Sequence, residues 1–110
     1  MEFVEASAFT RNLPAYLDED EYRALQRVLA ANPESGDVIP ETGGFRKLRW
    51  GHSARGKGKR GGLRVIYYHF VADSQIWFLT IYGKNEADDL TPTERRALKA
   101  AITSELRQRK

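Results

Sequence analysis

The first part of the chain has a pattern of apolar and polar residues that predicts a short strand followed by a short helix. Residues 2–5, Glu-Phe-Val-Glu, are typical of a short first strand. Residues 7–15 can form a helix with Ser7 as its N-cap. Pro14 argues against a long unbroken helix, because proline lacks the backbone N–H and fits poorly inside a helix.

A second helix is predicted directly after this. Residues 18–21 are all acidic, which suits a first helical turn because the helix dipole favours negative charge there. Apolar residues at helical spacing then form one stripe: Tyr22, Leu25, Val28 and Leu29. Asn32-Pro33 ends this helix, and the glycines and prolines of residues 33–44 predict a loop.

Three strands are predicted in the middle of the chain, at residues 45–50, 63–72 and 76–82. The last two are apolar on both alternating faces, as expected of central strands that are covered on both sides. Asp73-Ser74 between them is typical of a tight hairpin turn. The connection at residues 51–62 contains five glycines interleaved with bases, which predicts a mobile link between paired strands.

A last helix begins with a strong start signal. Thr91 is the expected N-cap, Pro92 takes the first helical position, and Glu94 completes a capping box. Its apolar face consists of Leu98, Ala101, Ile102 and Leu106. The predicted order βααβββα indicates an α+β domain with a small antiparallel or mixed sheet. We expect the helices on one side of that sheet, the two N-terminal ones packed together on one face.

Composition limits the class of protein. The chain has 110 residues, 41% of them hydrophobic and 30% charged, which fits one small domain over residues 1–110. Without cysteine, a disulfide framework, a thiolate metal site and thiol nucleophile chemistry are excluded. No secretory signal is recognisable, and the longest apolar stretch, residues 65–72, is far shorter than the ~20 residues that span a bilayer. We expect a cytoplasmic protein without a membrane segment.

Basic residues are concentrated in the middle of the chain. Residues 1–41 carry nine acidic and three basic side chains, whereas residues 42–72 carry eight basic side chains and no acidic one. The whole-chain charge of +3 conceals this positive segment. Nucleic acid is the first candidate partner, because phosphate contacts supply most of the sequence-independent affinity. The alternative is a solvated loop that binds nothing.

Strand geometry brings several of these bases toward one end of the predicted sheet. Alternation groups Arg64 with Ile66, Tyr68 and Phe70 on one strand, and Phe78 with Thr80 and Tyr82 on its neighbour. In a simple hairpin register, Arg64 and Tyr82 lie at the same end of the sheet. We therefore expect one concave patch formed by Lys57, Lys59, Arg60, Arg64, Tyr82 and Lys84.

The expected patch suits phosphoryl chemistry. It offers no paired carboxylates, no Ser–His–Asp set and no metal site, but cations stabilise the dianionic state of phosphoryl transfer. RNA supplies its own nucleophile, the 2′-hydroxyl, so a protein need only orient it, neutralise charge and move protons. A lysine or tyrosine among cations can be the general acid or base, and the residues leave open which is which.

Several aromatic and histidine residues have a structural interpretation beside the functional one. Tyrosine and tryptophan on these strands are more often core residues than catalytic ones, and His69 is expected in the core or at its margin. Trp50 is expected to pack under the sheet edge, with base stacking as the alternative. His52 is a candidate for proton transfer. The basic residues 107–110 are expected to form a solvated helix end.

Two segments resemble the most recognisable blocks of the HigB-type toxins of the RelE superfamily. These are residues 56–68, GKGKRGGLRVIYY, and residues 79–86, LTIYGKNE. Shorter matches at 36–39, 42–47 and 89–91 extend the resemblance over nearly the whole chain. It implies a RelE-like fold and the toxin of a type II toxin–antitoxin pair. Such toxins cleave mRNA, usually in the ribosomal decoding site, without a metal or other cofactor, and leave a 2′,3′-cyclic phosphate.

The resemblance also implies roles for individual residues. Lys57, Lys59 and Arg64 would bind the scissile phosphate, and Tyr82 and Lys84 would complete the catalytic site by stacking or proton transfer. Arg49 and Arg60 would contact phosphates of ribosomal RNA or mRNA. The further candidate contacts to RNA or the ribosome are Arg46, Lys47, His52 and Arg55. Asn85 stands where many RelE members place an arginine, so the identity of the acid and the base stays open.

The implied partners are mRNA, the ribosome and an antitoxin, commonly a helix-turn-helix protein encoded beside the toxin. The antitoxin would either cover residues 51–64 or block entry to the ribosome from elsewhere. Two alternative functions stay open. One is a toxin of the same fold that blocks a target such as DNA gyrase without cutting RNA. The other is a non-catalytic RNA-binding module that holds phosphate passively.

Overall fold

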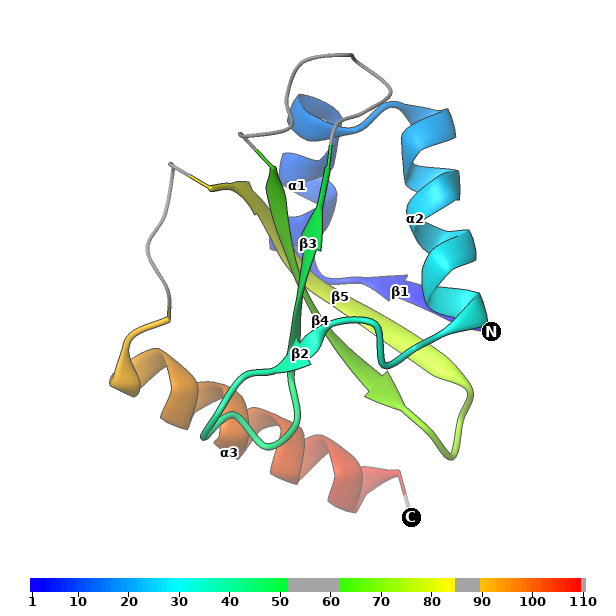
Figure 1. Ribbon diagram of the computed structural model, residues 1–110. Helices are drawn as coiled ribbons and strands as arrows, with labels where there is room; N and C mark the ends of the chain where they lie inside the picture. The colour runs from blue at the N-terminus through cyan, green and yellow to red at the C-terminus, as the bar shows by residue number, and fades with distance from the viewer. Residues whose placement is uncertain (52–61, 85–89, 110) are drawn as a thin grey trace.

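The protein is built on a five-stranded mixed sheet with the strand order β1-β5-β4-β3-β2 (Figure 1). The computed structural model describes residues 1–51, 62–84 and 90–109. The strands are β1 (Glu2–Glu5), β2 (Asp37–Val38), β3 (Arg46–Trp50), β4 (Leu63–Phe70) and β5 (Gln75–Gly83). β1 pairs with β5 in parallel, and the other neighbours are antiparallel. The predicted α+β class and the order βααβββα are confirmed, with β2 as an additional short strand.

In the described part of the chain, three helices cover the two faces of this sheet. α1 (Ser7–Tyr16) and α2 (Glu19–Ala31) pack on one face, and α3 (Pro92–Gln108) packs on the other (Figure 1). The two N-terminal helices thus share a face as expected, but placing every helix on one side was wrong for α3. The reason lies in β4 and β5, which are apolar on both faces and therefore need cover on both.

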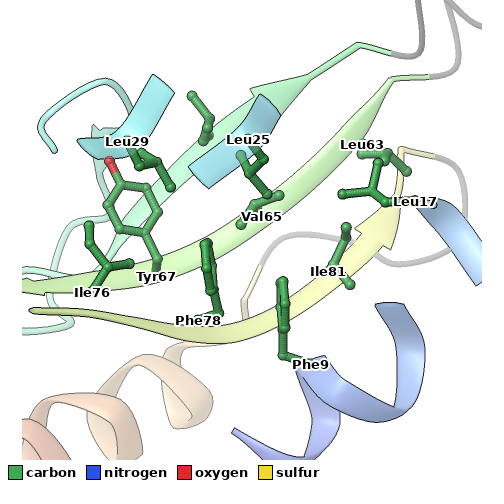
Figure 2. Packing of buried hydrophobic residues seen from close by; sticks show 11 residues of the cluster. Phe9, Leu17, Leu25, Leu29, Leu63, Val65, Tyr67, Ile76, Phe78 and Ile81 are labelled. Atoms are coloured by element: carbon green, nitrogen blue, oxygen red, sulfur yellow. The ribbon is translucent and has the colours of Figure 1, made fainter. Parts of the chain in front are cut away.

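The larger of two hydrophobic cores lies between the sheet and the helices α1 and α2 (Figure 2). Phe9 of α1 stacks on Phe78 of β5 with a centroid distance of 4.5 Å, and Leu25 and Leu29 of α2 are fully buried. A smaller core on the opposite face joins Ile66 and Phe70 of the sheet to α3. β4 therefore contributes buried residues to both cores, which makes it the central strand of the fold.

β5 contains a bulge that changes which residues face each core. Ile66 pairs with Thr80 but Tyr67 pairs with Phe78, so Leu79 is the extra residue. As a result Phe78 lies in the core beneath α1 and α2, whereas Tyr82 packs in the core beneath α3. The expectation that Phe78 and Tyr82 share a face was therefore wrong, because strict alternation does not survive an inserted residue.

The hairpin between β4 and β5 is longer than the predicted two-residue turn. β4 ends at Phe70 rather than at residue 72, and residues 71–74 form the turn. Ser74 adopts a left-handed backbone conformation with φ of 49°, and its N–H donates to the carbonyl of Val71 at 3.3 Å. This four-residue turn and the bulge together set the register that brings the site residues opposite one another.

Of the two predicted N-caps, Thr91 is confirmed and Ser7 is not, and Asp18, predicted in the first turn of α2, is the N-cap of that helix. Asp18 caps α2, and Thr91 caps α3, each closing a full capping box with the glutamate three residues later. Ser7 is not the N-cap of α1, because Ala6 holds that position without a side-chain hydrogen bond. Residues 33–44, predicted as loop, contain the two-residue strand β2.

Tyr67 fastens the connection before β2 to the sheet. Its buried hydroxyl donates to the carbonyl of Pro33 at 2.7 Å and accepts from the N–H of Gly36 at 2.9 Å. Burial raises the pKa of Tyr67 above its usual value, so the neutral hydroxyl is kept. Gly36 has no room for a side chain, because a Cβ there would lie 2.9 Å from Cε1 of Tyr67. This anchor holds β2 against β3.

Candidate functional site

Three functional candidates stand in one row across the sheet. Arg49 of β3 pairs with Arg64 of β4, and Arg64 pairs in turn with Tyr82 of β5. Side chains directly opposite one another in antiparallel strands have Cβ atoms about 4.5–5.5 Å apart. The expectation that Arg64 and Tyr82 lie at the same end of the sheet is thus confirmed, although the bulge and the longer turn produce that register.

A surface hollow of about 330 Å³ adjoins this row on the α3 face. Its apolar wall comes from the segment around β2, from β4 and from the residue before α3, and its polar rim comes from β3, β5 and α3. The lining residues are Asp37, Val38, Ile39, Pro40, Lys47, Arg49, Ile66, Tyr82, Leu90 and Arg95. A concave site with an apolar wall and a few convergent polar groups is typical of ligand pockets.

The charges of this hollow favour an anion. Lys47, Arg49 and Arg95 supply three basic side chains around it, against the one carboxylate of Asp37. Asp37 of β2 pairs with Lys47 of β3. Its carboxylate therefore lies beside Lys47, which is two residues from Arg49 on the same strand. Arg95 donates from Nε to the carbonyl of Leu90 at 3.3 Å, which holds its guanidinium at the start of α3. A single phosphate or a short run of RNA backbone matches this balance.

Lys84 lies beside the end of the same row. It is exposed directly after β5, and its backbone N–H donates to the carbonyl of Gly62 at 3.3 Å. Arg64 is half-buried over the same end of the sheet, with one Nη 3.4 Å from where a Cβ on Gly62 would stand. The structure therefore brings Arg64, Tyr82 and Lys84 to one end of the sheet.

The other predicted residues fall into two groups. Arg46 lies on the sheet face opposite the hollow and donates to the carbonyl of Gly36 at 2.8 Å, so it supports the Tyr67 anchor. The remaining candidates, His52, Arg55, Lys57, Lys59 and Arg60, lie outside the described residues, as does Asn85. Trp50 pairs with Leu63, and this is the last pair between β3 and β4 before residues 52–61. It directly follows the pair of Arg49 and Arg64.

Arg95 and Asp37 line the hollow but were not predicted as site residues. Arg95 precedes the buried Ile102 by seven positions, so helical spacing was a signal that it faces the sheet. Asp37 gave no such signal, because β2 exists only through its pairing with β3. The sequence therefore predicted the neighbourhood of Arg64 and Tyr82, but neither the place of Arg49 beside Arg64 nor the residues that β2 and α3 add to the hollow.

The structural interpretations of the aromatic residues hold in most cases. Tyr67 is fully buried, Trp50 packs partly buried against the core beneath α1 and α2, and Trp77 and Tyr68 pack in the core beneath α3. His69 is half-buried at the end of β4, which confirms the margin position. Tyr82 is also half-buried and is the aromatic residue of this group that lines the hollow.

The C-terminal arginines are not all solvated as expected. Arg109 donates to Asp73 at 2.7 Å and to Glu105 at 2.8 Å, and its guanidinium lies 3.7 Å from the ring centre of Phe70. The hydrogen bond to Asp73 is the main cause that raises the pKa of Arg109. The prediction failed because the β4–β5 turn is distant in sequence and approaches the end of α3 only in the fold.

No family model matches the chain. Across residues 1–51, 62–84 and 90–109, the structure contains no group of three or more His, Cys, Asp or Glu side chains arranged to hold a metal ion. In that same part of the chain, none of the helices has the length and apolar character needed to cross a bilayer.

Proposed function

We propose that this chain is the toxin of a type II toxin–antitoxin pair and acts as a ribosome-dependent endoribonuclease on mRNA. Two features support the proposal. One is the resemblance of residues 56–68 and 79–86 to the HigB-type toxins of the RelE superfamily. The other, which carries most weight, is the register that sets Arg64 between Arg49 and Tyr82 beside a basic hollow.

The proposed reaction needs no nucleophile from the protein. The 2′-oxygen of one ribose attacks the adjacent phosphorus, the bond to the 5′-oxygen breaks, and a 2′,3′-cyclic phosphate and a 5′-hydroxyl end result. Arg64 contacts the non-bridging oxygens, where charge accumulates, and Arg49 beside it holds a neighbouring phosphate. One proton leaves the 2′-hydroxyl and one reaches the 5′-oxygen, and Tyr82 and Lys84 are the described candidates for these transfers. Lys57 and Lys59 join Arg64 at the phosphate in this proposal, on the strength of the resemblance.

The hollow accommodates the nucleotide next to the cleaved bond. Its volume of about 330 Å³ suits a nucleobase against the apolar side chains of Ile66 and Leu90. Lys47 and Arg95 on its rim then meet the phosphate that follows. Such contacts position the message, so their loss weakens binding more than it slows the chemical step.

The test is inducible expression in bacterial cells, with growth and the 5′ ends of translated messages as the two measurements. Wild type is expected to stop growth and to produce new 5′-hydroxyl ends, and Arg64→Ala is expected to lower cleavage by about 10²–10³-fold, as loss of one preorganised charge contact does. Arg27→Ala, which removes an exposed base on α2, is the matched control and retains full toxicity. In lysates, divalent ions are chelated and Mg²⁺ alone is added back, because ribosomes need it to stay intact. Cleavage is expected to persist under these conditions.

Other outcomes would replace the proposal. Growth arrest with intact messages and accumulating cleaved DNA would assign the same fold to gyrase inhibition. Salt-dependent RNA binding without products, unchanged in Arg64→Ala, would assign a passive RNA-binding module. Within the proposal the site of action is the cytoplasm, and the partner is a helix-turn-helix antitoxin encoded by the adjacent gene, whose co-expression restores growth.

A further inference from the structure

One flank of α3 carries a row of basic side chains that belongs to neither the hollow nor the sheet. Arg96, Lys99 and Arg107 are all exposed there, and together with Ala100, Thr103 and Ser104 they line a shallow surface depression. At about 1.5 Å rise per residue the row extends over about 16 Å. Figure 1 shows α3 as one continuous helix, so the backbone positions of the three residues keep a fixed spacing along it. We call these three residues the basic flank of α3.

The positive charge of the basic flank is not balanced within the described residues. Neither Lys99 nor Arg107 forms a salt bridge there, and Arg96 donates to the hydroxyl of Thr93 at 3.3 Å. The two acids of α3 are engaged elsewhere. Glu94 accepts from the backbone N–H of Thr91 at 2.8 Å in the capping box, and Glu105 binds Arg109 at 2.8 Å. Within the part of the chain that the structure describes, the flank therefore presents a net positive field to solvent.

The composition of the flank indicates which polyanion fits it. α3 contains no aromatic residue, whereas proteins that hold single-stranded nucleic acid stack its bases on aromatic side chains. The residues between the cations, Ala100, Thr103 and Ser104, have side chains too short to reach deep into a groove. Double-stranded RNA is recognised mainly by its shape and its phosphates. A row of cations at fixed positions along one helix, separated by small residues, matches one strand of such a duplex.

The basic flank also continues the charge of the hollow. Arg95, which lines the hollow, directly precedes Arg96, and Lys99 lies next to the turn at Gly43, where a Cβ would be 3.5 Å from its Cγ. Glu41 in the same turn is exposed. An RNA helix on the flank would therefore lie beside the single-stranded segment in the hollow.

We propose that the basic flank of α3 is a second RNA-binding surface that contacts the phosphate backbone of double-stranded RNA. The proposal rests on the proposed function in taking RNA as the polyanion, and it extends that function by separating duplex binding from cleavage. Three phosphates are neutralised by Arg96, Lys99 and Arg107. The contact is electrostatic and does not depend on sequence.

The experiment measures binding of a fluorescein-labelled RNA duplex of about 20 base pairs by fluorescence anisotropy over a salt series. Arg96→Gln/Lys99→Gln/Arg107→Gln is compared with Arg11→Gln/Arg23→Gln/Arg27→Gln, which removes the same charge from exposed positions on α1 and α2. The flank variant is expected to bind about tenfold more weakly, with the slope of log K against log salt reduced by about two to three. The control variant and Arg96→Lys/Arg107→Lys, which keeps the charge, retain the wild-type slope.

The proposal is overturned if the flank variant binds the duplex with the affinity and slope of wild type. It is also overturned if the flank and control variants lose affinity equally, because that would indicate non-specific attraction by net charge. Preference of the flank for an acidic peptide over the duplex in competition would overturn it too, in favour of a protein partner. Message cleavage is scored separately. If wild type binds duplex through the flank but cuts no message, the proposed function fails and the second surface stands. If it cuts message and the flank variant binds duplex normally, only the second surface fails.

Discussion

Replacing Tyr67 by phenylalanine is expected to destabilise the protein strongly although only one oxygen atom is removed. The hydroxyl serves two partners, the carbonyl of Pro33 at 2.7 Å and the N–H of Gly36 at 2.9 Å. Gly36 is buried, so its N–H is left without a partner at a cost of about 1–3 kcal/mol. The lost bond to Pro33 adds about 1 kcal/mol, for a total of about 2–4 kcal/mol.

The loss is measurable as a decrease in Tm of about 8–16 °C, at about 4 °C per kcal/mol for a chain of this length. Tyr68→Phe is the matched control, because Tyr68 is the next residue of β4 and its hydroxyl has no hydrogen bond within the described part of the chain. It is expected to change the free energy of unfolding by less than about 0.5 kcal/mol. Hydrogen exchange at the Gly36 amide adds a local measurement.

The reasoning is refuted if the two variants unfold at the same temperature. It is also refuted if Tyr67→Phe lowers Tm without faster exchange at Gly36, because the anchor before β2 is the proposed cause. Since β2 supplies Asp37 and Val38 to the hollow, the same variant is expected to weaken RNA binding at temperatures where most of the protein is still folded.

Two further predictions concern the N-terminal helices and the bulge. Burial, followed by the hydrogen bond to Glu5 at 2.7 Å and its negative charge, raises the pKa of Tyr22. The stability that Tyr22 contributes is thus fully present below about pH 10, the ordinary pKa of tyrosine. It falls as the pH rises toward the folded-state pKa, by at most about 1.4 kcal/mol per pH unit. Urea unfolding at several alkaline pH values should show a shallower decline for Tyr22→Phe, and an identical decline would contradict the assignment. Deleting Leu79 removes the bulge but keeps the other pairs between β4 and β5, because Thr80 then follows Phe78 directly and still lies opposite Ile66. Tyr82 therefore stays opposite Arg64, and cleavage is expected to be retained. Loss of cleavage in a deletion variant that circular dichroism shows to be folded would contradict the view that register alone positions Tyr82.

The elements that sequence predicted well are those specified by neighbouring residues. The acidic start of α2, the capping box at Thr91 and the β-branched and aromatic content of β4 and β5 are local signals. Missed features depend on distant partners. β2 is only two residues long and is defined by its pairing with β3, and the bulge at Leu79 follows from registers that no single strand contains.

The same distinction applies to the candidate site. Arg64 and Tyr82 were placed together by strand alternation and hairpin register, and the structure pairs them. Arg46 was grouped with Lys47 and Arg49 by charge alone, but adjacent strand positions point to opposite faces, so it lies on the other side of the sheet. Charge counts locate a basic segment, whereas strand parity decides which of its members meet.

The bulge at Leu79 separates two parts of β5 that have different roles. The half next to the hairpin sends Phe78 into the main core, and the half beyond the bulge presents Tyr82 to the open surface. Past the bulge, Ile81 is still fully buried in the core beneath α1 and α2, so the positions there that can change without repacking that core are those on the Tyr82 face. This part of the strand thereby keeps one face as scaffold and leaves the other as an adaptable working surface.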